Sequence, residues 1–490
     1  MPAARSAGSV SALGVLILAA GKGVRMRSSR VKLLHSLGGA PMVCHVARAA
    51  WQLRPRVLAA VVGSQAGEVT EALESLGARG LRFVTQKQQL GTGHAVLQAE
   101  RLLRKMRAGS GTLLILNGDV PLIRPETLRA LVNHHRKTGA AATALTTKVA
   151  NPAGYGRVLR GSHGFEGVAE EKDASEEQKA IQEINAGLYC VEAAKAFSAL
   201  RRTGRANAQR EYYLPDLFPI LRGDGERIEA YVHPDAEEVL GINDRAELAA
   251  AGRTLFRRKA GELMAAGVTL IDPDQTYIEP EVQVGQDTII SPMVQIQGRT
   301  RIGAGCRIGA LVRIVDSTLG NQVTVRDMCV IMESRLANGS TVGPFTHLRP
   351  GSVLEQDVHV GNFTEVKKSR LGRGSKANHL SYLGDATIGA GCNIGAGTIT
   401  CNYDGVAKHP TILEDGVFIG SDTQLVAPVK VRRGAYVGAG STITKDVPAG
   451  ALALTRAPQR NIEGWVARTR KSKPPGKSRP RGKAAHRRRR

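Results

Sequence analysis

Aliphatic residues return at every sixth position through the C-terminal half of the chain. The repeated positions are Val284, Ile290, Ile296, Ile302, Ile308 and Ile314, then Leu319, Val325 and Ile331, then Leu336, Val342, Leu348, Leu354, Val360 and Val366, then Ile388, Ile394 and Thr400, and finally Ile419, Leu425, Val431, Val437 and Ile443. A period of six matches neither the turn of an α-helix nor the alternation of a strand. It is typical of hexapeptide repeats, in which each unit gives one short strand and one corner. The pattern therefore predicts a parallel β-helix of about nine coils, with three units in each coil.

The repeat is interrupted between residues 375 and 402, where a histidine stands inside the pattern. His379 lies close in sequence to Lys367 and Tyr382, and the segment 400–410 departs from the six-residue period. A lone histidine more often has a structural or surface role than a catalytic one. From the pattern alone, the β-helix is compatible with an enzyme, a scaffold or an oligomerisation stalk.

The N-terminal half alternates short apolar runs with helical patterns. The apolar runs, which predict buried strands, are residues 15–20, 57–62, 81–84 and 113–116, and helical spacing marks residues 68–76 and 95–106. Alternation of this kind indicates an open α/β sheet. Ligands of such sheets bind at the carboxyl ends of the strands, so the residues that follow each run are the first candidates for a site.

A glycine-rich loop follows the first predicted strand. Gly21 and Gly23 allow the backbone to approach an anion closely, and Lys22, Arg25 and Lys32 can neutralise phosphate charge. The loop lacks the third glycine of a dinucleotide fingerprint and the Gly-Lys-Ser/Thr of a P-loop. An ordinary strand-to-helix turn with solvated lysines is the alternative interpretation of this loop.

Asp119 follows the strand predicted at residues 113–116, in the sequence NGDVPL. A carboxylate at this edge of the sheet is well placed to hold Mg²⁺ beside phosphates, because Mg²⁺ prefers a few protein oxygens together with substrate oxygens. The alternative is an aspartate that begins a turn before a proline.

Residues 245–266 change to Ala, Leu, Arg and Glu at helical spacing, and Gly267 provides a stop. This segment predicts a helix that links the two halves. Four basic residues, Arg253, Arg257, Arg258 and Lys259, raise a nucleic-acid-binding helix as a competing hypothesis, although a solvated basic face is the commoner situation.

The net charge of +25 is concentrated at the C-terminus. Twelve lysines and arginines follow Glu463, and no Asp or Glu does. The composition of this Pro, Gly and Ser-rich tail predicts disorder, and its charge raises attraction to nucleic acid or to an anionic membrane as a hypothesis.

The six cysteines form neither a CxxC pair nor a zinc-spaced cluster, which favours a reducing compartment. Residues 10–20 imitate a short signal peptide, but cleavage there would destroy the first strand and its glycine loop. The apolar runs fall short of the roughly 20 residues of a membrane span. We therefore expect a cytoplasmic protein.

Taken in order, the N-terminal motifs resemble the sugar-1-phosphate nucleotidylyltransferases. The motifs are LAAGKGVRM at 18–26, QQLGTGHA at 88–95, NGDVPL at 117–122 and GYGR at 154–157. Three more, EEKD at 170–173, QEINAG at 182–187 and GINDR at 241–245, narrow the resemblance to enzymes that uridylylate N-acetylglucosamine 1-phosphate. The resemblance implies a Rossmann-like α/β nucleotidyltransferase domain. Asn117 is a departure, since some relatives carry an aromatic residue there.

The same resemblance implies the following residue roles. Mg²⁺ would be held by Asp119 and Asn243, and UTP or UDP-N-acetylglucosamine would be bound by Leu18, Ala19, Ala20, Gly21, Gly23, Arg25, Lys32, Gln86, Gly91, Thr92, Asn117, Gly118, Gly156, Glu170, Asn185 and Asn243. Within this set, Gly156, Glu170 and Asn185 correspond to the residues that hold the sugar.

The C-terminal motifs resemble the glucosamine-1-phosphate acetyltransferase half of the same bifunctional family. They are NFTEVKK at 362–368, GRGSKANHLSYLGD at 372–385, NIGAGTITCNYDG at 393–405 and VFIGSDTQLVAPV at 417–429. The resemblance implies a left-handed β-helix, a homotrimer and acetyl-coenzyme A as co-substrate. It gives His379 as catalytic base, Glu365 as the residue that orients it, Arg349, Lys367, Tyr382 and Asn393 as the binding set for glucosamine 1-phosphate, and Ala396, Asn402, Tyr403, Ser421, Ala439 and Arg456 as the binding set for acetyl-coenzyme A.

The resulting prediction is a bifunctional enzyme of UDP-N-acetylglucosamine synthesis, which feeds peptidoglycan and lipopolysaccharide precursors. The predicted domains are a uridylyltransferase domain at 1–245, a linker helix at 246–268, an acetyltransferase β-helix at 269–464 and a basic tail at 465–490. Two alternatives stay open: a nucleotidylyltransferase for another sugar phosphate whose β-helix only assembles trimers, and a nucleic-acid-associated protein that uses its positive charge.

Overall fold

The computed structural model describes residues 12–21, 23–63, 66–78, 80–105, 111–162 and 164–471 of the chain. Lys22 and the basic tail beyond Lys471, both singled out from the sequence, lie outside these residues. The chain divides into two compact units, 1–351 and 352–490. Each unit is described separately below.

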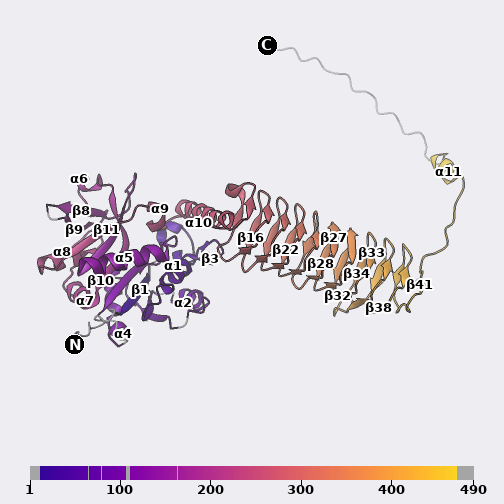
Figure 1. Ribbon diagram of the computed structural model, residues 1–490, viewed down its shortest axis with the longest axis horizontal. Coiled ribbons are helices and arrows are strands. Elements are labelled where there is room, and N and C mark those ends of the chain that lie inside the picture. The colour runs from indigo at the N-terminus through magenta and orange to yellow at the C-terminus, as the bar shows by residue number, and fades with distance from the viewer. Residues whose placement is uncertain are drawn as a thin grey trace, which may run out of the picture. The chain divides into compact units, whose positions relative to one another are not determined.

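The first unit begins with a mixed nine-stranded sheet, whose main path runs β11-β7-β10-β6-β1-β4-β5 (Figure 1). Its strands are β1 (Leu13–Ala19), β4 (Val57–Val62), β5 (Arg82–Thr85), β6 (Thr112–Asn117), β7 (Ala142–Lys148), β8 (Arg157–Gly161), β9 (Gly164–Ala169), β10 (Glu183–Glu192) and β11 (Ile228–Val232). The four strands predicted from apolar runs are the parallel group β6-β1-β4-β5, which confirms an open α/β sheet.

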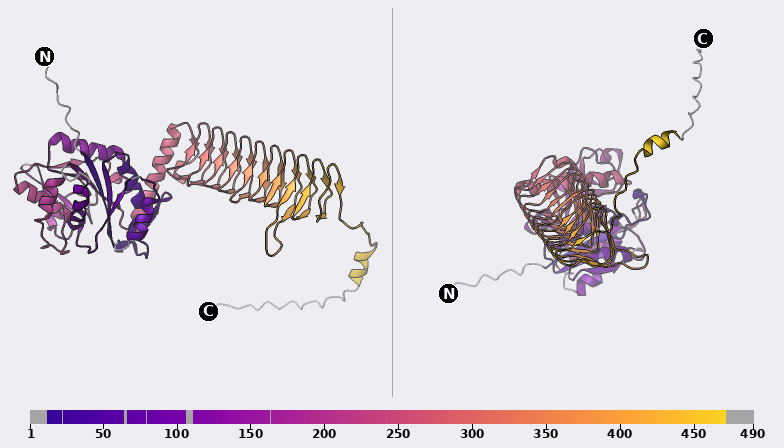
Figure 2. Two further views of the ribbon diagram at one scale, coloured as in Figure 1. Left: turned by 90° about the horizontal axis from the view of Figure 1, so that it is seen from below. Right: turned by 90° about the vertical axis from the view of Figure 1, so that its right-hand side faces the viewer.

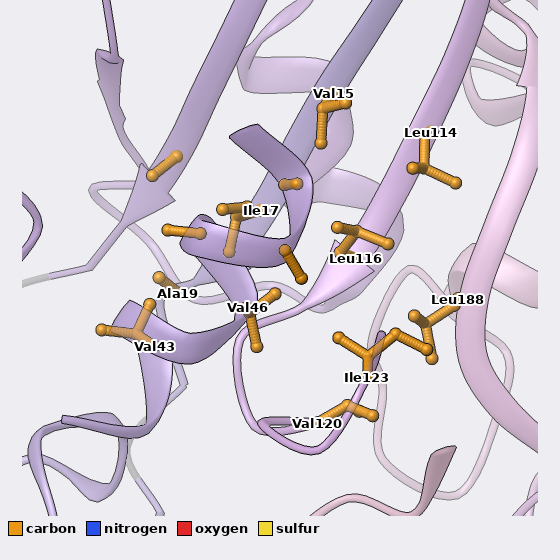
Figure 3. Close-up of a cluster of buried hydrophobic side chains, with 14 of the residues drawn as sticks. Val15, Ile17, Ala19, Val43, Val46, Leu114, Leu116, Val120, Ile123 and Leu188 are labelled. Atoms are coloured by element: carbon orange, nitrogen blue, oxygen red, sulfur yellow. The ribbon is translucent and has the colours of Figure 1, made fainter. Parts of the chain in front are cut away.

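Helices cover both faces of this sheet. They are α1 (Met42–Trp51), α2 (Ala66–Glu74), α3 (Thr92–Gln98), α4 (Glu100–Lys105), α5 (Pro125–Thr138), α6 (Glu176–Lys179), α7 (Ala193–Leu200), α8 (Leu217–Gly223) and α9 (Ala236–Val239). Val15, Ile17 and Ala19 of β1 join the core under α1, α2 and α5, part of which Figure 3 shows, whereas Leu16 joins the core under α3, α4, α7 and α8. Successive side chains of β1 therefore point into two different cores, one on each face of the sheet. This explains why the strand is apolar at every position.

One predicted helix is wrong in extent. The helical spacing at 95–106 suggested a single helix, but α3 ends at Gln98 and α4 begins at Glu100. The helix predicted at 245–266 is confirmed as α10 (Arg245–Ala265), which the side chain of Asp244 caps by accepting hydrogen bonds from the N–H groups of Ala246 and Glu247.

The rest of the first unit is made of short parallel strands, each two or three residues long. They are β12 (Thr269–Leu270), β13 (Tyr277–Ile278), β14 (Gln283–Val284), β15 (Ile289–Ile290), β16 (Gln295–Gln297), β17 (Arg301–Ile302), β18 (Arg307–Ile308), β19 (Arg313–Val315), β20 (Thr318–Leu319), β21 (Thr324–Val325), β22 (Val330–Met332), β23 (Arg335–Leu336), β24 (Thr341–Val342) and β25 (His347–Leu348). Every third strand pairs in parallel, so the chain closes one coil with three strands.

The second unit repeats this arrangement (Figure 2). Its strands are β26 (Val353–Leu354), β27 (His359–Asn362), β28 (Glu365–Lys367), β29 (Arg370–Leu371), β30 (Lys376–His379), β31 (Tyr382–Gly384), β32 (Ala386–Ile388), β33 (Asn393–Ile394), β34 (Ile399–Cys401), β35 (Thr411–Leu413), β36 (Phe418–Ile419), β37 (Gln424–Val426), β38 (Val429–Val431), β39 (Tyr436–Val437), β40 (Thr442–Ile443) and β41 (Leu452–Ala453), followed by α11 (Trp465–Lys471). Parallel pairing again joins every third strand.

The aliphatic position of the hexad fills the interior of the coils. Ile290, Ile308, Leu348, Ile394 and Val437 are all buried, and Val284, in the first coils, is only half-buried. The predicted parallel β-helix is therefore confirmed in both units. A second interior position, two residues before the aliphatic one, often holds Ser, Thr or Cys, and these side chains bond to neighbouring coils. The N–H of Cys392, for example, donates to Oγ of Ser375 at 2.9 Å.

Candidate functional sites

The first site lies where the parallel strands of the α/β sheet end. The strand order β6-β1-β4-β5 brings the residues that follow each strand to one edge. The backbone is tightly packed there: the N–H of Gly118 donates to the carbonyl of Leu18 at 2.9 Å, and a side chain at Gly63 would lie 2.7 Å from the carbonyl oxygen of Ala20. These close contacts form the floor of the edge and leave little room for side chains at Gly63 and Gly118.

Two cationic and two oxygen-bearing side chains meet above this floor. The Nζ of Lys32 lies 2.6 Å from Oδ2 of Asp119 and 2.9 Å from Oδ1 of Asn243, and the Nη2 of Arg25 donates to the same Oδ1 at 2.8 Å. Gly23 makes this possible, since it has a φ of +63° and a side chain there would collide with Lys32. Residues that are more than 200 positions apart thus form one cluster.

A cavity of about 220 Å³ opens beside this cluster. Eight of the residues predicted from the sequence line it: Arg25, Thr92, Asn117, Asp119, Gly156, Glu170, Asn185 and Asn243. Leu18, Ala19, Ala20, Gly21, Gly23, Gln86, Gly91 and Gly118 belong to the strand ends and loops of the same sheet but do not line the cavity. The structure therefore brings the predicted metal and sugar residues together in one chamber.

Glu170 and Asn185 sit on the wall of the cavity formed by β8, β9 and β10. Burial raises the pKa of Glu170 to about 7, and the nearby carboxylates of Asp216 and Asp173 add to the shift. The amide of Asn185 donates to the hydroxyl of Tyr189 at 2.6 Å, across an irregularity in the pairing of β10 with β7. Asn185 lines the cavity, and its hydrogen bond to Tyr189 holds the amide group in place.

The oxygen atoms of Asp119 and Asn243 fit a magnesium ion. Both already lie within 3 Å of a single positive charge, the ammonium of Lys32, and a carboxylate with an amide oxygen is the kind of donor set that Mg²⁺ takes beside phosphate oxygens. Within the part of the chain that the structure describes, no group of three His, Cys, Asp or Glu residues could hold a metal. An ion at this site would complete its coordination with substrate or water oxygens.

Tyr155 and Arg157 are important residues that the sequence reasoning did not select. The hydroxyl of Tyr155 donates to the carbonyl of Gly241 at 3.2 Å, and burial raises its pKa to about 12. Arg157 is fully buried, donates to the carbonyls of Tyr155 and Lys179, and forms an ion pair with Glu171 at 2.7 Å. The motif GYGR contained both residues, but only the structure reveals that they brace the cavity wall.

The second site is a column of residues along one corner of the β-helix in the second unit. The registered pairs Ala377–Ile394, Ile394–Ile419 and Ile419–Val437 place residues 379, 396, 421 and 439 at equivalent positions in four consecutive coils. His379, Ala396, Ser421 and Ala439 therefore form one line, along which neighbouring coils are about 4.8 Å apart. Arg456 extends the line, because its guanidinium donates to the carbonyl of Ala439 at 2.9 Å.

The other predicted residues of this unit flank the column. Tyr382 pairs with Glu365 in register, and its hydroxyl lies 3.5 Å from the amide of Asn402, which also donates to Asp385 at 2.5 Å. Lys367 lies in β28 and Asn393 in β33. Gly384 is required here, since a side chain would meet the Tyr382 hydroxyl at 2.4 Å.

The segment at 402–410 leaves the regular coil, as the sequence predicted (Figure 2). Tyr403 forms an isolated bridge with Lys408 and is mostly exposed. Hydrogen bonds from the N–H of Ala407 and from His409 hold the pKa of Asp404 well below its usual range. The loop is thus ordered by its own contacts while its aromatic side chain faces outward. Arg349 belongs to the first unit, so its predicted role with these residues remains a prediction.

Three family models match parts of the chain: the MobA-like NTP transferase domain at residues 15–204, the GMPPB C-terminal domain at 272–376 and the hexapeptide repeat of succinyl-transferase at 410–445. The Bifunctional protein GlmU of Anaeromyxobacter sp. (strain Fw109-5) is 51% identical over 93% of this chain and 93% of its own length. The chain belongs to the GlmU family. GlmU proteins of Trichlorobacter lovleyi and Syntrophotalea carbinolica are 49% and 51% identical over the same share of the chain.

Membership of the GlmU family agrees with the two sites, one in a nucleotidyltransferase-type sheet and one on hexapeptide repeats. All six cysteines of the chain are free, and five of them are buried. None of the helices within the described residues is long and apolar enough to cross a membrane.

Proposed function

We propose that the chain is a bifunctional cytoplasmic enzyme that acetylates glucosamine 1-phosphate and then uridylylates the product to give UDP-N-acetylglucosamine. The observation that carries the proposal is the pairing of two sites in one chain: the cluster of Lys32, Asp119, Asn243 and Arg25, and the column that begins at His379. The product belongs to cell-wall precursor synthesis, as expected for a member of the GlmU family.

In the uridylyl transfer, a phosphate oxygen of N-acetylglucosamine 1-phosphate attacks the α-phosphorus of UTP, and the bond to the β-phosphate breaks to release pyrophosphate. This reaction needs positioning and charge neutralisation rather than a protein nucleophile. The side chains of Arg25 and Lys32 neutralise phosphate charge from one side of the cavity. Glu170 and Asn185 hold the sugar hydroxyls on the opposite wall. UTP and N-acetylglucosamine 1-phosphate are thereby oriented towards each other.

Asp119 and Asn243 would hold Mg²⁺, which would supply positive charge beside the triphosphate. The Nζ of Lys32 contacts both of these oxygens and could turn towards the phosphates instead. This half of the proposal is tested by measuring pyrophosphate release from UTP and N-acetylglucosamine 1-phosphate. The release should stop when Mg²⁺ is removed. Continued release in the presence of a chelator would overturn the metal assignment.

In the acetyl transfer, the amine of glucosamine 1-phosphate attacks the thioester carbonyl of acetyl-coenzyme A. The carbon–sulfur bond breaks, the thiol leaves, and the amine proton passes to a base. A neutral imidazole at His379 is the appropriate base, and Glu365 orients it. Lys367, Tyr382 and Asn393 bind the sugar phosphate.

The thioester lies along the corner column. The small residues Ala396, Ser421 and Ala439 leave a strip without bulky side chains, and Arg456 at its far end supplies a positive charge for coenzyme phosphates. From His379 to Ala439 the strip extends over three coil spacings, roughly 14 Å, which suits the extended pantetheine arm. Asn402 and Tyr403 complete the binding set from the loop. Release of coenzyme A thiol from acetyl-coenzyme A and glucosamine 1-phosphate tests this half.

The working assembly in this proposal is a homotrimer. A row of exposed apolar residues at left-handed corners, Met293, Leu311 and Met328, occupies equivalent positions in the first unit, and Leu380 follows His379 directly in the second. Exposed apolar rows of this kind favour contact with another chain. A second copy against Leu380 would enclose His379, and the Asn402–Tyr403 loop could then serve a neighbour's site. A monomer with full acetyltransferase activity would contradict this assembly.

The principal alternative is a nucleotidylyltransferase for another sugar phosphate, with a β-helix that serves only as a scaffold. The column from His379 to Ala439 favours the bifunctional enzyme, because a scaffold has no need of a histidine aligned with small residues over four coils. Absence of thiol release by the full chain, together with intact pyrophosphate release, would support the alternative.

A further inference from the structure

A chain of three polar side chains runs beside the end of β5 in the first unit. The Nε2 of Gln86 lies 3.1 Å from the carbonyl oxygen of Gly91 and 2.9 Å from Nδ1 of His94, and the Nε2 of His94 lies 3.0 Å from the side-chain amide of Gln98. Gln86 is buried, His94 is half-buried and Gln98 is exposed. His94 belongs to the motif QQLGTGHA at 88–95.

The two contacts of Gln86 point to one arrangement of protons in the inner part of this chain. A backbone carbonyl can only accept, so the group of Gln86 that faces Gly91 is its NH₂. The second hydrogen of that NH₂ points to Nδ1 of His94, which must therefore be an acceptor. The ring proton then resides on Nε2, where the amide nitrogen of Gln98 lies 3.0 Å away, so the exposed amide of Gln98 must turn over for its oxygen to accept that proton.

The neutral form of His94 is the form that this arrangement needs. Burial lowers the pKa of His94. The ring also packs on Tyr212, with centroids 6.3 Å apart and planes 29° from parallel, and the backbone of Tyr212 bonds to Leu90 and Gly93. The imidazole is therefore held in place on one face and at both nitrogen atoms.

The side-chain oxygen of Gln86 remains available as an acceptor. Among the described residues none donates a hydrogen bond to it, and the side chain is 3% exposed. The backbone of Gln86 is fixed as well, because its N–H donates to the carbonyl of Val62 at 2.8 Å. A fixed carboxamide oxygen accepts an N–H from a ligand and repels a lone pair.

We infer that His94 is a positioning residue that fixes the amide of Gln86 with its oxygen towards the nucleobase, and so selects uracil over cytosine. The ring nitrogen N3 of uracil carries a hydrogen, whereas N3 of cytosine carries a lone pair. Without an acceptor at His94, the amide of Gln86 loses one of the two partners that hold its orientation and can present its NH₂ to cytosine. The inference rests on the proposed uridylyl transfer and names the residue behind its base specificity.

The test compares kcat/KM for UTP and CTP in the full chain. His94→Phe keeps an aromatic ring against Tyr212 but removes Nδ1, and His94→Asn restores an acceptor through its carboxamide oxygen. We expect the UTP-to-CTP ratio to fall about tenfold in His94→Phe, and to return to within about twofold of wild type in His94→Asn. Should the larger ring prevent folding, His94→Leu provides the same comparison.

A double-mutant cycle separates positioning from a general structural role. If His94 acts through Gln86, then adding His94→Phe to Gln86→Ala leaves the nucleotide ratio of Gln86→Ala unchanged. A loss of stability would lower both kcat/KM values together without moving their ratio. An unchanged ratio in both His94→Phe and His94→Leu, with wild type still preferring UTP, would overturn the inference. Failure of wild type to use any nucleoside triphosphate would instead overturn the proposed function.

Discussion

The two sites of this chain are built in different ways. In the first unit, Arg25, Lys32, Asp119 and Asn243 come from separate loops and meet only because an open sheet brings its strand ends together. In the second unit, the column from His379 to Ala439 follows from counting along a regular coil. A site on a repeat can thus be located by register, whereas a site at a sheet edge depends on contacts between distant residues.

This difference predicts that the two activities can be broken independently, and the largest effect is expected at His379. His379→Ala removes the base for the amine proton and should lower acetyl transfer about a thousandfold, while uridylyl transfer stays within about twofold of wild type. Thiol release and pyrophosphate release, measured on the same preparation, check both statements. Loss of both activities would contradict the separation.

The matching change in the first unit is Asp119→Asn. The substitution removes the carboxylate from the predicted metal site, and we expect uridylyl transfer to fall at least about a hundredfold with acetyl transfer unaffected. A titration should show that the variant needs a higher Mg²⁺ concentration to reach half of its maximal activity. An unchanged Mg²⁺ dependence would remove Asp119 from the site.

A smaller effect is expected from the titration of Glu170. Its pKa of about 7 means that the carboxyl group is mostly neutral at pH 6 and mostly charged at pH 8. As a charged acceptor for sugar hydroxyls, it should raise kcat/KM for N-acetylglucosamine 1-phosphate about tenfold over this interval. Glu170→Gln provides the control, because any change in kcat/KM that comes from titration of the substrate phosphate persists in this variant. Its kcat/KM should lack the roughly tenfold rise between pH 6 and pH 8. Identical profiles for the two proteins would exclude this role.

The smallest effect on catalysis is expected from the basic tail. Deleting residues 472–490 removes most of the charge that follows Glu463 but no residue of either site. Both activities should remain within about twofold, while retention on heparin or DNA should weaken and lose its steep salt dependence. Unchanged retention would show that the tail does not attract polyanions.

The repeat architecture was predictable because each six-residue unit places an aliphatic residue at the same position. Ile290, Leu348 and Val437 are buried as their period requires, and α10 begins at the predicted Arg245. The side-chain bonds from the second interior position, such as that of Ser375, were missed because serine and threonine carry no apolar signal. The break between α3 and α4 was missed because helical spacing persists across Ala99.

The contacts of the first site could not be predicted from spacing. Nothing in the sequence indicates that Lys32 bridges Asp119 and Asn243, or that Arg157 is buried beneath the cavity wall. These contacts depend on how loops from several strands converge, which local patterns do not encode. Family resemblance supplied the names of the residues, and the structure supplied their geometry.

One reaction with the full chain, glucosamine 1-phosphate, acetyl-coenzyme A, UTP and Mg²⁺, analysed by the mass of its products, tests directly whether the chain carries both activities. We expect UDP-N-acetylglucosamine, pyrophosphate and coenzyme A. Without UTP the reaction should stop at N-acetylglucosamine 1-phosphate, and without acetyl-coenzyme A it should give no N-acetylated product. Formation of a nucleotide sugar from unacetylated glucosamine 1-phosphate at the same rate, with no thiol released, would contradict the claim of two activities.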